Sequence, residues 1–397
     1  MSKKTQIAVA AALALAIMPA IAMSQTNGAA KASAAKAPAA KAPSKAGGYK
    51  APRLADGRPD IGGFWQNGTM TKLTRDVSLG DRKNYTEDEV RKIEGDNAAR
   101  TASFNKPTDP NLGVNTPDQC QSGSRGAACG YNAGWTDPGD HIMRVNGEPR
   151  TSLVTYPANG RPPAPKAGAG GRGGRGPAPV IVADDGEGGE GAPPAARGGA
   201  GRGGGAGRGA APQGGAAQYA NPETAGLAMR CIMSFGQSTG PIMLSQLYNN
   251  NYRFVQGKDT VAIWVEMVHD VRVIRIGAKH RTDGVRPYMG DSIGHYEGDT
   301  LVVETTNFPS TTNLQGSSAN LTMIEKFTRV GANRLLYQFE ARDPTVWDQP
   351  WGGEYEFVRS TGVFEYACHE GNYALEGVLA GARAEDKAAA APKSAAR

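Results

Sequence analysis

The 397-residue sequence lacks several short motifs that identify common enzymes. It has no His-Glu-x-x-His pair, no phosphate-binding loop and no glycine fingerprint that opens a helix after a strand. Zinc-protease, nucleotide-hydrolase and dehydrogenase mechanisms therefore have no support. The chain has four cysteines without Cys-x-x-Cys spacing, which disfavours a thiolate metal site. Beyond the first 22 residues, no stretch is apolar enough to span a bilayer.

The first 22 residues have the three parts of a secretory leader. Lys3 and Lys4 precede an apolar run over residues 7–22, which ends in an Ala-x-Ala cleavage site. The alternative is a membrane anchor, but the run is shorter than the roughly 20 residues that a spanning helix needs. No cysteine follows it for lipid attachment. The sequence therefore predicts cleavage near Ala22 and a periplasmic or secreted protein without a membrane span.

Basic residues are concentrated in two low-complexity segments. The chain has 44 basic and 38 acidic residues, a formal net charge of +6, and the leader holds two of the lysines. Residues 29–48 are rich in Ala, Lys and Pro, a composition that predicts a disordered tether. Residues 161–215 are rich in Gly and Arg, as are disordered RNA-binding repeats. This segment lacks aromatics, contains acids and lies in an exported chain, so we interpret it as a disordered loop insertion with no nucleic-acid partner. Contact with anionic surface polymers is the alternative.

An oxidising compartment favours disulfides between the four cysteines. Four cysteines allow three pairings. Cys120 and Cys129 flank a short Gly/Ser/Arg loop, so we expect a local bridge there. Cys231 would then pair with Cys368 and join the start of the C-terminal region to its end.

Apolar runs separated by turn residues predict a mainly β fold. Asn146-Gly147 and Gly298-Asp299 are strong turn signals. Thr86 and Glu89 form a capping box that predicts a helix up to about residue 102, and residues 372–390 predict a C-terminal helix. The predicted strands are 60–65, 142–146, 151–156, 252–256, 260–267, 271–276, 294–297, 300–306, 321–330, 334–341, 353–359 and 363–369.

Consecutive antiparallel strands leave exposed edges unless their sheet closes. A meander of about eight strands therefore predicts an antiparallel up-and-down barrel with an N-terminal helix, a C-terminal helix and long disordered insertions. The expected segments are a leader at 1–22, a tether at 23–48, a strand, helix, disulfide loop and hairpin at 49–160, the Gly/Arg insertion at 161–217, the barrel with its C-terminal helix at 218–390, and a tail at 391–397.

Two resemblances refine this prediction. Gly63-Phe64-Trp65 resembles the Gly-x-Trp tripeptide that opens lipocalin-like barrels, and this likeness implies a calycin-type fold with an apolar cavity for a small lipophilic ligand. The long loop and insertion between residues 105 and 215 depart from a compact lipocalin. Segments 56–65, 150–153, 248–252, 266–270, 298–305 and 367–373 resemble a widespread family of exported bacterial proteins of unassigned function. That likeness implies localisation and fold, but no reaction.

Three residues are candidates for proton transfer. Glu266 lies in the most apolar predicted strand, where a carboxylate needs a partner or a shifted pKa. It is therefore a candidate acid or base, and the alternative is an ion pair with Arg272 or Arg275. His269 stands at the following turn beside Asp270, and its alternative role is local capping. Glu304 has a setting similar to that of Glu266, so the two carboxylates would share one cavity if both strands face inward in register.

The remaining candidates are ligand contacts. Tyr131, Asn132 and Trp135 form an aromatic and polar loop that can close a binding site. Trp347 and Trp351 have the same potential, or they plug the barrel end. The predicted ligand-binding set is completed by Asn250, Trp264 and Arg272. The five histidines have no ligand-like local spacing, so we expect no metal site and no cofactor.

Three functions remain open at this point. The first is an exported barrel that binds a small apolar or aromatic molecule. The second is a cofactor-independent lyase, isomerase or hydrolase on the same barrel that uses Glu266 and His269. The third is an envelope interaction protein whose Gly/Arg segment contacts an anionic polymer.

Overall fold

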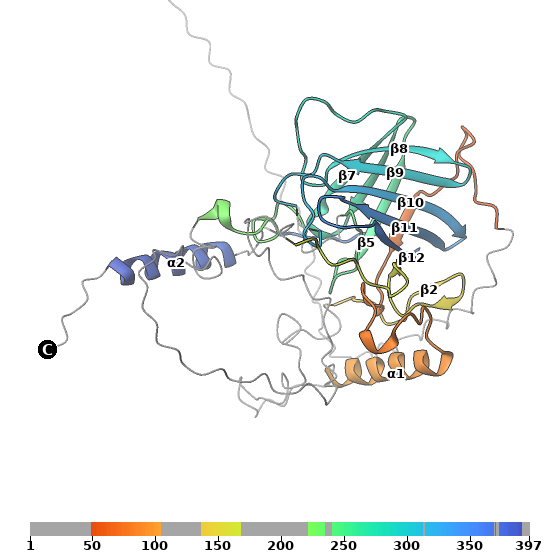
Figure 1. Cartoon of the computed structure of the whole chain (residues 1–397), viewed down its shortest axis with the longest axis horizontal. Coiled ribbons are helices and arrows are strands. Elements are labelled where there is room, and N and C mark those ends of the chain that lie inside the picture. The colour runs from red at the N-terminus through yellow and green to blue at the C-terminus, as the bar shows by residue number, and fades with distance from the viewer. Residues whose placement is uncertain are drawn as a thin grey trace, which may run out of the picture. The chain divides into compact units, whose positions relative to one another are not determined.

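The computed structural model describes residues 49–104, 136–167, 221–234, 240–312, 314–368, 370 and 373–390. Within these residues, nine strands form a sheet that closes on itself, which confirms the predicted mainly β barrel (Figure 1). Around the barrel they are β1 (Gly63–Gln66), β5 (Asn251–Gln256), β6 (Thr260–Val265), β7 (Val271–Ile276), β8 (Asp291–Glu297), β9 (Thr300–Thr306), β10 (Thr322–Gly331), β11 (Arg334–Arg342) and β12 (Trp351–Arg359). The short strand β1 closes the barrel because it pairs with β5 on one side and with β12 on the other.

One strand pair departs from the predicted antiparallel meander. β7 and β8 run parallel, with Ile274 opposite Ser292 and Ile276 opposite Gly294. A parallel return needs a crossover of roughly a dozen residues or more, because a tight turn reverses the chain direction. Residues 277–290 provide this crossover, and we call them the crossover strap. The prediction of a purely antiparallel up-and-down barrel is therefore wrong at this seam.

Alternate residues of the strands fill the barrel interior, as the two-residue period of a strand requires. The interior is rich in aromatic rings. Phe254 and Phe327 pack edge to face with ring centroids 5.4 Å apart, and Tyr337 and Tyr355 do so at 5.0 Å. Full burial of an apolar side chain of this size contributes about 1.5–3 kcal/mol, so these rings are a main source of the barrel's stability.

The Gly-x-Trp tripeptide joins the first strand of the barrel to the last. Trp65 is fully buried, and its indole N–H donates a hydrogen bond to the Ile61 carbonyl at 3.0 Å. The Arg359 guanidinium lies over the Trp65 ring, 4.4 Å from its centroid. Gly63 has a φ of +114°, and a Cβ atom there would lie 1.9 Å from Nη1 of Arg359. Position 63 therefore requires glycine both for its backbone conformation and for the approach of the arginine.

The predicted N-terminal helix is α1 (Glu87–Phe104), preceded by the 3-10 turn η1 (Val77–Leu79). Its capping box is formed: the Glu89 N–H donates to Thr86 Oγ1 at 3.3 Å, and the Thr86 N–H donates to Glu89 Oε2 at 2.8 Å. The turn at Asn146-Gly147 joins two short strands, β2 (Arg144–Val145) and β3 (Glu148–Pro149).

The segment that follows this hairpin pairs with the barrel. β4 (Val154–Tyr156) lies beside β12, where a Cβ atom at Gly353 would stand 2.0 Å from the Leu153 carbonyl oxygen. The glycine thus permits the close approach of the two chains. The buried Arg150 adds an ion pair to Glu354 at 2.7 Å. Residues before the insertion are therefore fixed to the barrel wall.

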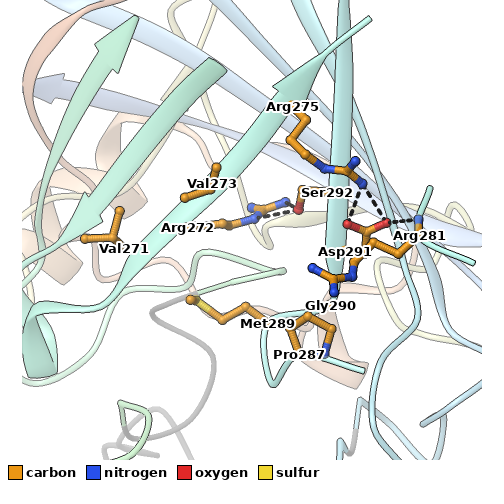
Figure 2. Close-up of a pocket in the computed structure, with 10 residues that line it drawn as sticks. All are labelled: Val271, Arg272, Val273, Arg275, Arg281, Pro287, Met289, Gly290, Asp291 and Ser292. Carbon is orange, nitrogen blue, oxygen red and sulfur yellow. Dashed lines mark hydrogen bonds and ion pairs between the residues drawn. The ribbon is translucent and has the colours of Figure 1, made fainter. Parts of the chain in front are cut away.

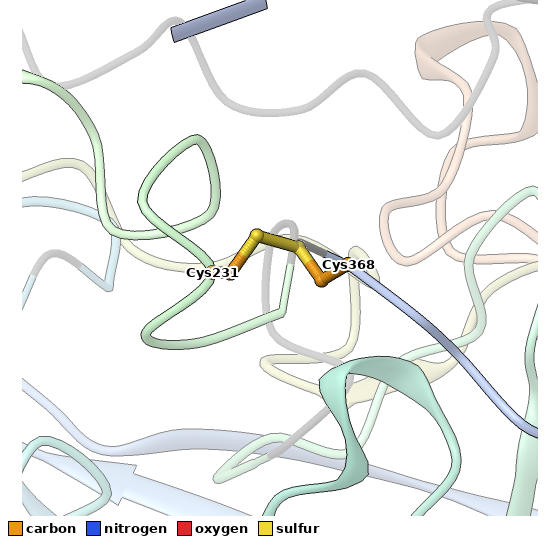
Figure 3. The surroundings of a disulfide bond; sticks show 2 residues. All are labelled: Cys231 and Cys368. Atoms are coloured by element: carbon orange, nitrogen blue, oxygen red, sulfur yellow. A yellow bond between two sulfur atoms is a disulfide. The ribbon is translucent and has the colours of Figure 1, made fainter. Parts of the chain in front are cut away.

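The chain after β12 differs in part from its prediction. Residues 363–368 do not form the expected strand, whereas the terminal helix is present as α2 (Ala374–Ala390). Cys231 and Cys368 form the predicted disulfide, with Cα atoms 5.8 Å apart, and this bond joins the region around η5 (Pro222–Thr224) to the chain end after β12 (Figure 3). Cys120 and Cys129 lie outside the described residues. None of the helices described here is long and apolar enough to cross a membrane.

Candidate functional site

Glu266 is buried just after β6, as the sequence predicts, but the groups that donate hydrogen bonds to its carboxylate are neutral. Oε2 accepts hydrogen bonds from the backbone N–H and the side-chain amide of Asn251, at 2.9 and 2.7 Å. Oε1 accepts one from the backbone N–H of Phe364 at 3.0 Å. The expected ion pair with Arg272 or Arg275 is wrong, because these residues pair with other acids. Glu266 thus connects β5 to the segment that follows β12.

His269 does not meet the Glu266 carboxylate. It lies exposed at the end of η6 (Met267–His269), and its backbone N–H donates to the Glu266 carbonyl at 3.2 Å. No hydrogen bond between the His269 ring and the Glu266 side chain occurs in the described part of the chain. The neighbouring Asp270 is half-buried, and this burial raises its pKa to about 6. The described residues offer no partner to its Oδ2 atom.

Glu304 lies on the outer face of the barrel. The next residue, Thr305, is fully buried, so strand alternation places the Glu304 side chain outside. It therefore does not share the interior with Glu266. Its Oε1 atom lies 3.1 Å from Nε2 of His280, and Nδ1 of the same ring lies 2.9 Å from Oδ2 of Asp291. This chain of three groups attaches the crossover strap to β8 and β9.

Arg272 points into the barrel and binds Glu325, a residue that sequence reasoning missed. The side chains are 2% and 0% exposed, and both terminal nitrogens of the guanidinium contact the carboxylate, one of them at 2.9 Å. The Tyr337 hydroxyl donates to the same carboxylate at 2.8 Å. Thr305 and Ser292 accept further hydrogen bonds from Arg272 at 2.9 and 3.3 Å. A buried, fully partnered ionic network therefore lies inside the aromatic core.

Part of the barrel interior is filled by the chain itself. Ile242 and Met243 are completely buried. The Met243 carbonyl accepts hydrogen bonds from the Asn67 amide at 2.6 Å and from the Tyr355 hydroxyl, and its N–H donates to the Tyr337 hydroxyl at 3.4 Å. Inward-facing polar groups that could meet a ligand are thus used by the segment before β5.

The other predicted ligand contacts are structural or lie outside the description. Asn250 is buried, accepts a hydrogen bond from the Gln246 N–H at 2.6 Å and donates to the Gln246 carbonyl at 2.8 Å. Trp347 and Trp351 are buried against each other, with ring centroids 5.8 Å apart, so they pack the core. Tyr131, Asn132 and Trp135 lie outside the described residues.

Trp264 is not among the residues that line the groove on the outside of the barrel. Its strand partner is Val271, and the groove of about 250 Å³ lies where β7 and β8 diverge (Figure 2). Val271 and Val273 belong to one wall and are 48% and 51% exposed. Pro287 and Met289 of the crossover strap line it as well. These four side chains give the groove an apolar character.

The polar groups of the groove come from both sides of the seam. Arg272 and Ser292 line it and also belong to the buried network, so the groove borders the ionic centre of the barrel. Arg275, Arg281 and Asp291 supply the remaining charges. We call this hollow the seam groove. A second hollow, of about 390 Å³, lies beside α1. The residues that line it precede and follow residues 105–135 in the sequence, and these are outside the described residues. No site is assigned to this hollow.

No significant match was found when the chain was compared with protein-family models, curated proteins and solved structures. Within the residues that the structure covers, no three His, Cys, Asp or Glu side chains gather in a way that could hold a metal ion.

Sequence reasoning also missed two other features. His280 and Asp291 belong to the strap and its exit, and the length of that loop was the available signal, since it is too long for a hairpin. Residues 236–240 have the Gly-x-Ser-x-Gly spacing of a nucleophile elbow. Of these, only Gly240 is described, and residues 240–250 contain no helix, although a nucleophile elbow leads from a strand into one.

Proposed function

We propose that the protein is exported and binds a small apolar or aromatic molecule in the seam groove. The observation that carries this proposal is the pair Val271 and Val273, two outward-facing side chains of one strand that remain about half exposed beside a hollow of about 250 Å³. A cavity of about 150 Å³ can hold benzene. Pockets for drug-sized ligands begin at roughly 300 Å³. The groove therefore suits one ring with a short substituent.

The composition of the groove supports a ligand role. Ligand sites combine apolar walls with a few fixed polar groups. Pro287 and Met289 add to the apolar surface, while Arg275, Arg281 and Asp291 supply its charged groups. The leader at residues 1–22 supports export. The strand around Trp65 supports a calycin-type assignment, but the filled interior favours a ligand site on the outside.

The enzyme alternative has less support from the geometry. Its proposed pair, Glu266 and His269, is not joined by a side-chain hydrogen bond, and Glu266 is engaged by three N–H donors. These contacts favour a structural role for this carboxylate.

A fluorescence titration tests the proposal. The neutral one-ring dye 4-(dimethylamino)benzonitrile, whose emission depends on solvent polarity, is added to the full chain without its leader, and emission is followed as the dye leaves water. The groove-filling variant Val273→Phe should weaken dye binding at least ten-fold. The matched control is Val255→Phe, because Val255 is 47% exposed on the same outer face, two strands away in register. Absence of dye binding to the wild type, or equal weakening in both variants, would refute the assignment.

A further inference from the structure

Three successive outward positions of β7 combine apolar and cationic character. Val271, Val273 and Arg275 alternate with the inward residues Arg272 and Ile274. A strand rises about 3.3 Å per residue, so Val271 and Arg275 stand roughly 13 Å apart along it. A ligand whose apolar part covers the two valines would therefore place its other end at a guanidinium.

Arg275 retains hydrogen-bonding capacity. Only its Nη2 atom contacts Asp291, at 2.8 and 3.0 Å from the two carboxylate oxygens (Figure 2). Its Nε and Nη1 atoms have no partner in the described part of the chain, and its side chain is 37% exposed. A guanidinium carries five N–H donors. Arg275 can therefore bind a second anion without releasing Asp291.

Asp291 is shared among several donors. Besides Arg275, it accepts hydrogen bonds from the Arg281 backbone N–H at 2.8 Å and contacts His280 Nδ1 at 2.9 Å. Burial alone would raise its pKa, but these hydrogen bonds outweigh that effect and lower the pKa below the ordinary value. The carboxylate thus stays ionised and fully occupied, and it offers little to a ligand cation.

The crossover strap adds positive charge next to the groove. It carries Lys279, Arg281 and Arg286 against a single acid, Asp283. Arg281 and Asp283 form an exposed pair, which solvent screens.

The strap's third cation is held without an acid. Arg286 donates to the carbonyls of Phe308 and Ala319, so its charge meets backbone oxygens rather than a carboxylate in the described contacts. The opposing charges are Asp283, Asp291 and Glu304, the last of which is 46% exposed on the other side of the His280 ring. Arg275 and the three strap cations are thus four positive charges against three acids. The surroundings of Arg275 therefore attract anions.

We propose that the seam groove selects amphiphilic anions: a ring or short alkyl chain lies on Val271 and Val273, and a carboxylate or a similar oxyanion binds Arg275. Charge-assisted hydrogen bonds to a guanidinium are shorter and stronger than neutral ones. This inference rests on the proposed function, because the apolar half of the ligand occupies the same groove. It adds the chemical class of the ligand and the residue that recognises its charge.

Three ligands of nearly equal shape test the inference: 4-phenylbutyrate, 4-phenylbutanol and 4-phenylbutylamine, titrated calorimetrically into the full chain without its leader. We expect the acid to bind at least ten-fold more tightly than the alcohol, and the amine to bind most weakly. Arg275→Gln should reduce the affinity for the acid to that for the alcohol and leave the alcohol unchanged, whereas Arg275→Lys should retain part of the preference. Arg253→Gln is the matched control, since Arg253 is exposed on the same outer face on β5.

The outcomes separate the two proposals. If neither acid nor alcohol binds, the proposed function fails and the inference fails with it. If both bind equally, or if the preference for the acid survives in Arg275→Gln, the groove stands and the inference is overturned. A free acid and a lipid headgroup share this chemistry. Displacement of phenylbutyrate by phosphatidylglycerol vesicles would identify the lipid form, and retention in their presence would identify the free acid.

Discussion

Replacing Glu325 by glutamine tests the buried network most directly. The substitution keeps the shape of the side chain but leaves the Arg272 guanidinium, which is 2% exposed, without its counter-charge. Thr305 and Ser292 remain as neutral acceptors. Breaking a buried ion pair by removal of one partner costs about 3–5 kcal/mol. Whole domains are stable by only about 5–15 kcal/mol, so we expect a large fall in the urea midpoint of Glu325→Gln.

A second variant separates the lost charge from lost packing. In Arg272→Met/Glu325→Leu both charges are replaced by apolar groups, a change that is often neutral or stabilising. Tyr337 then loses its acceptor, at a cost of about 1–3 kcal/mol. The double variant should therefore be more stable than the single one.

Unfolding is followed by tryptophan fluorescence in urea. The control is Lys92→Gln, which breaks an exposed pair with Asp96 and should leave the midpoint unchanged. A wild-type midpoint for Glu325→Gln, or a double variant less stable than the single one, would refute the reasoning. It would mean that water reaches Arg272 through the seam groove.

Three further predictions concern the ends of the barrel. Glu266→Gln places an amide donor among N–H groups, so this substitution should lower the free energy of unfolding by about 1–3 kcal/mol. Dye binding in the seam groove should stay unchanged. Loss of dye binding without destabilisation would contradict the structural role of Glu266. The pKa of Asp270 is raised by burial to about 6, so the folded chain holds this proton more tightly than the unfolded chain and stability falls as pH rises from about 4 to about 6. Asp270→Asn should therefore raise the melting temperature at about pH 7.5 and change it little at about pH 4.5; equal effects at both would disprove the assignment. The Cys231–Cys368 bridge spans 137 residues, and its removal by a double serine substitution should cost about 2–5 kcal/mol, whereas free thiols in non-reducing peptide maps of the wild type would show that the bridge does not form.

The strands were largely predictable because local patterns determine them. β7 and β9 have the bounds that alternation and turn residues indicated. The direction of β8 was not predictable in this way, since alternation is the same in parallel and antiparallel strands. The strand expected at 363–369 failed for a different reason. In the described part of this segment the Phe364 N–H donates to the Glu266 carboxylate, a side chain, instead of to a neighbouring strand.

The site residues were predictable one at a time, but their pairing was not. Burial of Glu266 follows from its apolar neighbours. Glu325 has the same signal between Met323 and Phe327, yet its partner Arg272 is 53 residues away in the sequence. Register around the barrel decides which inward side chains meet, and no spacing rule contains that information.

The parallel seam explains both the failed prediction and the position of the groove. The ladder between β7 and β8 begins only at Ile274, so residues 271–273 have β6 on one side and the groove on the other. An antiparallel hairpin would have continued the ladder along β7 and covered this stretch. The crossover instead returns as a strap, which leaves Val271 and Val273 half exposed and brings Arg281 beside Arg275. Functional sites are expected where an otherwise regular fold breaks its own pattern. Here the parallel pairing of β7 and β8 is that irregularity, and it creates both the apolar wall and the cationic end of the groove.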